Sequence, residues 1–61
     1  MKITDYFQLK NIDKNQAAKE LQITKAYLYE LLGNRMKPGR KLAQRIIIWS
    51  NGDIRFDDLW S

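Results

Sequence analysis

The chain contains neither cysteine nor histidine among its 61 residues. It therefore has no disulfides, none of the usual zinc ligand sets and not the side chain most often used as a general base. No apolar run approaches the roughly 18 residues of a membrane span, and the first eleven residues lack the apolar core of a signal peptide. These absences predict a reducing, cytoplasmic setting and no membrane partner.

Carboxylate pairs, which would point to acid–base or metal chemistry, are also scarce. Asp57 and Asp58 are the only adjacent pair, and they lie in a short C-terminal segment without a set of metal ligands around them. Two acidic residues together are also a common signal for the start of a helix. We therefore expect no enzyme, and no catalytic residue, metal, cofactor or small-molecule substrate.

The length of the chain sets a ceiling of one domain, residues 1–61. A domain of this size buries only about 60% of the surface that its unfolded chain exposes, so it is marginally stable alone. An apolar content of 44% is sufficient for a small core and argues against disorder. Pairing with a second copy would bury more surface, which favours a homodimer.

Positive charge is concentrated in one part of the sequence. The net charge is +4, but residues 25–45 alone hold six basic residues and one acidic residue, which is +5, and the remainder is −1. A localised basic patch is typical of a polyanion partner, although a solvated basic face has the same charge. The six basic residues are Lys25, Arg35, Lys37, Arg40, Lys41 and Arg45.

The stretch from Gln16 to Gly39 has the pattern of two short helices joined by a tight turn and followed by a basic loop. Asp13 and Thr24 are good N-caps, because their side-chain oxygens can accept from the first N–H groups of a helix. They predict helices over about 14–21 and 25–32, and hence a helix-turn-helix over about 14–33.

Three residues carry further expectations about the ends of these helices. Gln16 completes a capping-box pattern with the N-cap three residues earlier. Gln22 is the turn residue, where a left-handed backbone costs a non-glycine residue on the order of 1 kcal/mol. Gly33 is suited to the left-handed position that often follows a helix.

The flanking segments also read as short helices. We expect one over about 1–10, capped by Thr4 or its neighbour, and another over about 40–50 after Pro38 and Gly39. Residues 53–60 read as an extended entry and a one-turn helix, with a short edge strand as the alternative. The prediction is an all-α fold of four to five short helices.

The helix over 25–32 has an apolar face and a face of mixed chemistry. Leu28, Leu31 and Leu32 fall at helical spacing and face inward. The residues that then face outward are Lys25, Ala26, Tyr29, Glu30 and Gly33. This outward face is a plausible reader of a DNA groove.

Each outward side chain has a chemistry that suits DNA. Lys25 can donate to guanine O6 and N7, and the Ala26 methyl can meet a thymine methyl. Glu30 can accept from cytosine N4, or it is simply a surface charge. Tyr29 can donate to a phosphate, or it is a half-buried ring.

The apolar spacing and the turn resemble a known family. The pattern A-x-x-L-x-I-T-x-x-x-L-x-x-L-L-G over Ala18–Gly33 resembles the Cro/repressor-type, or Xre, helix-turn-helix family. The tail, with Leu42-Ala43-x-x-Ile46, Asn51-Gly52-Asp53-Ile54 and Asp58-Leu59, resembles that of small prophage Cro-like regulators. Two departures are Gln22, where the family usually has glycine, and Gly33-Asn34, where Asn-Gly is common.

The resemblance implies a lambda-repressor-like domain with a short C-terminal extension, bound to double-stranded DNA through the helix over 25–32 in the major groove. It places Lys25, Ala26, Tyr29 and Glu30 at base edges. The residues that it places at phosphates are Lys14, Thr24, Asn34, Arg35, Lys37 and Arg40.

One such helix reads few base pairs, so a specific regulator is expected to bind a palindromic operator as a dimer. A repressor of transcription fits this best. An antitoxin that regulates its own operon, or a helical adaptor that has lost DNA binding, stays open as an alternative. The candidates for the dimer surface are Ile47, Ile48, Trp49, Ile54, Phe56, Leu59 and Trp60, of which Ile54, Phe56 and Leu59 are expected in the monomer core instead.

Overall fold

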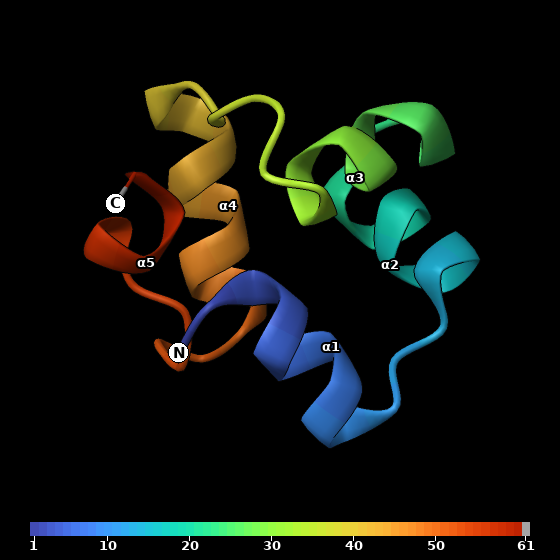
Figure 1. Ribbon diagram of the computed structural model, residues 1–61, viewed down its shortest axis with the longest axis horizontal. Helices are drawn as coiled ribbons and strands as arrows, with labels where there is room; N and C mark the ends of the chain where they lie inside the picture. Colours follow the sequence, from blue (N-terminus) through green and yellow to red (C-terminus); the bar gives the residue numbers. More distant parts are fainter. Residues whose placement is uncertain (61) are drawn as a thin grey trace.

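The computed structural model describes residues 1–60, which form five α-helices and no strand (Figure 1). The all-α class is confirmed, and the edge strand considered for residues 53–60 is absent from this range. No helix in the described range is long and apolar enough to cross a membrane. The helices are α1 (Ile3–Lys10), α2 (Lys14–Leu21), α3 (Lys25–Leu32), α4 (Arg40–Trp49) and α5 (Phe56–Trp60).

Helix α1 begins earlier than its expected cap. Its N-cap is Lys2, whose side chain makes no capping hydrogen bond, so the prediction that Thr4 or its neighbour caps the helix is wrong. Packing fixes this start instead, because the first helical residue, Ile3, is already buried in the core. The helix ends at Asn11 in the left-handed conformation (φ 52°), which asparagine tolerates well.

The N-caps of α2 and α3 are confirmed. Asp13 Oδ1 accepts from the N–H of Asn15 at 3.0 Å, and Thr24 Oγ1 accepts from the N–H of Tyr27 at 3.0 Å. Gln16 does not close a capping box, because its amide donates to Glu20 one turn further along the helix, at 3.2 Å. Local hydrogen bonding thus defines where both helices begin.

The turn between α2 and α3 has the expected left-handed residue, whereas the end of α3 differs from the expectation. Gln22 is left-handed (φ 60°), as predicted for this turn. Gly33 is not, since its φ is −79°, and the left-handed position falls one residue later at Asn34 (φ 59°). Asparagine is the residue after glycine that best tolerates this conformation, so the shift carries little strain.

The core draws on all five helices and on the segment before α5. Its buried apolar residues are Ile3, Tyr6, Phe7, Ala17, Ala18, Leu21, Leu28, Leu31, Ala43, Ile46, Ile54 and Leu59. The expectation that Ile54 and Leu59 are core residues is therefore confirmed. The same expectation for Phe56 is wrong: its side chain is 37% exposed, because α5 turns only its Leu59 side inward.

Helix α4 lies in the middle of the molecule. Helices α2 and α3 lie on one side of it and α5 lies on the other (Figure 1). Trp49, at the end of α4, packs against the rings of Tyr6 and Phe7 with centroid distances of 5.6 and 5.5 Å. Its Nε1 donates to Glu20 Oε1 at 2.6 Å, which ties α4 to α2.

Candidate nucleic-acid interface

Helix α3 presents a free face to solvent. Leu28 and Leu31 are buried, and the opposite side exposes Lys25, Ala26 and Tyr29. The Lys25 ammonium lies 5.8 Å from the centroid of the Tyr29 ring, one turn along the helix. Such a cation–π contact orders both side chains at the surface. The predicted base-contacting residues are thus side by side and face away from the core.

Glu30 is the member of this group that the structure leaves least accessible, because its side chain is half-buried. It forms no ion pair with Lys25 or any other basic residue in the described range, where the one ion pair joins the N-terminal ammonium to Asp58. Its main-chain carbonyl accepts from the N–H of Arg35 at 3.1 Å. Glu30 therefore adds a partly accessible carboxylate to the edge of the face.

The start of α3 is suited to an anion. The first N–H groups of a helix have no partner within the helix, and they carry the positive end of its dipole. Thr24 takes up the N–H of Tyr27, and the N–H groups of Lys25 and Ala26 come before it in the first turn. An exposed lysine beside free N–H groups is the arrangement that binds phosphate.

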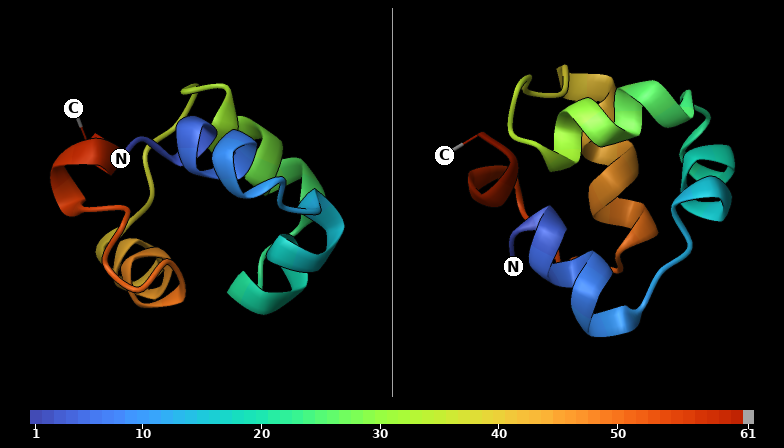
Figure 2. Two further views of the ribbon diagram at one scale, coloured as in Figure 1. Left: turned by 90° about the horizontal axis from the view of Figure 1, so that it is seen from below. Right: turned by 45° about the vertical axis from the view of Figure 1, so that its right-hand side comes forward.

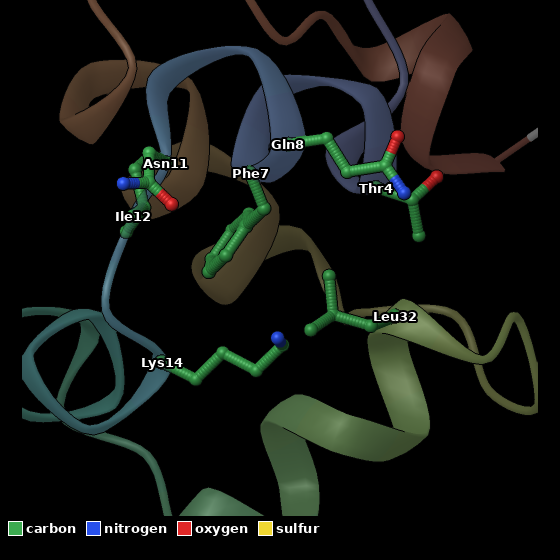
Figure 3. Close-up of a pocket in the computed structure, with 7 residues that line it drawn as sticks. All are labelled: Thr4, Phe7, Gln8, Asn11, Ile12, Lys14 and Leu32. Atoms are coloured by element: carbon green, nitrogen blue, oxygen red, sulfur yellow. The ribbon is translucent and has the colours of Figure 1, made fainter.

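Lys14 lies at the start of α2, beside an open cavity of about 260 Å³ between α1, α2 and the end of α3. Figure 3 shows its side chain running along the edge of this cavity with the ammonium toward Leu32, opposite Thr4 and Gln8. The side chain is exposed, and its charge is available to a partner. Lys14 thus sits where the sequence placed it, at the N-terminal end of the first helix of the motif.

The basic loop, Gly33–Gly39, joins α3 to α4. Asn34 and Arg35 are exposed in its first half, and Arg40 is exposed at the first position of α4. Lys37 differs from these, because its ammonium donates to the main-chain carbonyl of Trp60 at 2.8 Å. Lys37 is therefore directed toward α5. The guanidinium groups of Arg35 and Arg40 form no hydrogen bond or ion pair with another of the described residues.

Two contacts that sequence reasoning missed hold the motif in place. Arg45 donates from Nη1 to the carbonyl of Leu21 at 3.2 Å and so caps the end of α2. The carboxylate of Glu20 accepts from Trp49 and from Gln16, and these hydrogen bonds lower its pKa below the ordinary value. The Arg45–Leu21 and Glu20–Trp49 contacts join α2 to α4. Their partners are far apart in the sequence, so no local pattern predicts them.

Comparisons of the chain with protein-family models, curated proteins and solved structures gave no significant match. The function of the protein is therefore inferred from the contacts described above.

Proposed function

We propose that this protein is a sequence-specific regulator of transcription that binds double-stranded DNA through α3 in the major groove. The observation that carries the proposal is the free face of α3, where Lys25, Ala26 and Tyr29 are exposed together beside the N–H groups of the first turn. A helix of this width fits the major groove, and these side chains are short or polar enough to meet base edges. The likeness of the sequence to Cro/repressor-type domains supports the same reading.

In this docking, phosphate contacts fix the helix in the groove and base contacts select the sequence. Lys25, Ala26, Tyr29 and Glu30 face the bases. Phosphates are met by the groups around the helix ends and the loop, which are Lys14, Thr24, Asn34, Arg35 and Arg40. Lys37 reaches a phosphate only by exchanging the Trp60 carbonyl for it. Repression follows from occupying the operator, without catalysis.

A homodimer would supply the second reading helix, and the side of the molecule away from α2 and α3 suits it. Ile48 on α4 is 75% exposed, and Trp60 on α5 is 41% exposed. Between α4 and α5 an open groove of about 420 Å³ is lined by apolar side chains together with Arg55 and Asp57. Arg55 and Asp57 of one copy could pair with Asp57 and Arg55 of the other across a two-fold axis, as a self-complementary interface requires. A dimer formed there leaves α3 free.

Selection from a random duplex library at about physiological salt tests the proposal. We expect enrichment of an inverted repeat whose half-sites lie about one helical turn, 34 to 36 Å, apart. A Lys25→Ala chain provides the matched control, since it keeps the fold and should enrich a different half-site. Weak binding that disappears as salt rises, without enrichment, would contradict the proposal and favour a protein–protein adaptor.

A further inference from the structure

The two halves of the basic loop are held in different ways. The N–H groups of its first three residues donate to carbonyls in the last turns of α3, at 2.9 to 3.2 Å. Residues 36–38 make no backbone–backbone hydrogen bond within the described part of the chain. The half of the loop that leads into Arg40 is therefore ordered by side chains.

Met36 packs against the core and Pro38 is buried, and the side chain and carbonyl of Trp60 add two hydrogen bonds to this half of the loop. The Lys37 ammonium donates to the Trp60 carbonyl at 2.8 Å, and the Trp60 indole Nε1 donates back to the Pro38 carbonyl at 2.9 Å. Two hydrogen bonds in opposite directions thus tie consecutive loop residues to one residue that is 22 and 23 positions away. Figure 2 shows α5 beside this part of the loop in both views.

The rest of α5 keeps Trp60 in place. The Trp60 ring packs against Phe56 with centroids 5.1 Å apart, and Leu59 is buried in the core. Asp58 accepts from the N–H of Arg55 at 3.0 Å, which closes the first turn of this short helix. Trp60 therefore belongs to a helix that is itself anchored in the core.

We propose that Trp60 is a positioning residue that braces the basic loop, so that Arg35 and Arg40 are already in place when DNA arrives. The inference rests on the proposed function, because it assigns the loop to phosphates. It adds that α5, which supplies none of the proposed DNA contacts, contributes to the affinity through the loop. A loop ordered in advance loses less entropy on binding than one that must be ordered by the DNA.

The size of the effect follows from the bond that is removed. Trp60→Phe keeps an aromatic ring against Phe56 and keeps the carbonyl that binds Lys37, but it removes the indole N–H. One neutral hydrogen bond corresponds to a roughly two- to tenfold change in an equilibrium constant. We expect Trp60→Phe to weaken DNA binding by about that factor for every sequence alike.

The salt dependence of DNA affinity distinguishes an effect on loop position from an effect on charge. The variant retains every lysine and arginine, so the slope of log affinity against log salt should equal that of the wild type. The matched control is Trp49→Phe, which removes the other described indole hydrogen bond, the one to Glu20. This control should lower thermal stability, yet leave the order of the loop unchanged.

Two measurements make the test. Backbone amide relaxation measured by NMR on the free proteins reports the order of the loop residues 34–37 and 39, and fluorescence anisotropy with the enriched duplex at several salt concentrations reports affinity. Support requires lower order parameters in the loop together with weaker binding at an unchanged slope in Trp60→Phe. Unchanged order parameters overturn the brace, and lower order parameters with unchanged affinity overturn its part in DNA binding.

A second variant keeps the inference testable if Trp60→Phe does not fold. Lys37→Met retains the apolar stem of an exposed side chain and removes the other hydrogen bond of the brace together with one charge, so the order parameters of the loop amides in the free protein should again fall. Unchanged order parameters in this variant would overturn the brace. A wild-type chain that binds no duplex would refute the proposed function, whereas the relaxation measurement would still decide whether the brace exists.

Discussion

Thr24 allows the stability of α3 to be separated from its contact with DNA. Its Oγ1 accepts from the N–H of Tyr27 at 3.0 Å, and the proposed docking places the same residue near a phosphate. Thr24→Ala removes the cap. Because Thr24 is exposed, water can replace the lost oxygen, and we expect a loss of about 1 kcal/mol within the usual range of 0.5 to 2. In a domain this small that loss lowers Tm by roughly 4 to 8 °C.

Thr24→Asp separates the two roles. An aspartate caps a helix as well as threonine does and interacts favourably with the helix dipole, so its unfolding free energy should stay within about 0.5 kcal/mol of the wild type. The same carboxylate would face a phosphate in the proposed complex. We therefore expect DNA affinity to fall at least tenfold while the fold is retained, because like charges a few ångströms apart repel.

Urea denaturation followed by circular dichroism gives the stabilities, and fluorescence anisotropy gives the affinities. Thr24→Ser, which keeps the hydroxyl, is the control and should match the wild type in both assays. An unchanged stability in Thr24→Ala would refute the capping role. Full DNA affinity in Thr24→Asp would refute the placement of the start of α3 against a phosphate.

Three further predictions concern pH, DNA contacts and assembly. Hydrogen bonds from Trp49 and then Gln16 lower the pKa of Glu20 below 4.5, so the stability that they provide is complete above about pH 5 and is lost as the pH falls through the lowered pKa. Acid titration of unfolding should therefore be shallower in Glu20→Gln, and identical curves would contradict this linkage. Arg35→Ala should weaken binding to all duplexes alike and reduce the slope of log affinity against log salt by about 1, measured by anisotropy. An unchanged slope together with little loss of affinity would exclude a phosphate contact. Ile48→Asp should yield a monomer in sedimentation. Leu9→Asp on α1, where the side chain is 68% exposed against 75% for Ile48, is the control that stays dimeric; a dimer in Ile48→Asp would place the interface elsewhere.

The helices of the motif were predictable because their signals are local. Asp13 and Thr24 act on N–H groups two and three residues away, and the leucines of α3 bury one face at helical spacing. The exposure of Lys25, Ala26 and Tyr29 follows from the same periodicity. For this reason the sequence identified the face that we propose to read DNA.

Other features depend on how the helices pack, and there the sequence was insufficient. Nothing local separates Phe56, which is partly exposed, from Leu59, which is buried. The left-handed residue after α3 proved to be Asn34, because the chain continues one residue further before it turns. The expected cap at Thr4 failed because Ile3, buried in the core, is already the first helical residue, so the N-cap position falls at Lys2.

The sequence by itself therefore determined the helical class, the ends of α2 and α3 and the residues on the outward face, since each depends on neighbours within a few positions. Only the tertiary structure decided where the long polar side chains go. Arg45 reaches the end of α2, Glu20 meets Trp49, and Lys37 meets Trp60, across 23 to 29 positions of sequence. Such pairs form because packing of the core brings the helices together, and helical periodicity contains no information about which distant partner will be within reach.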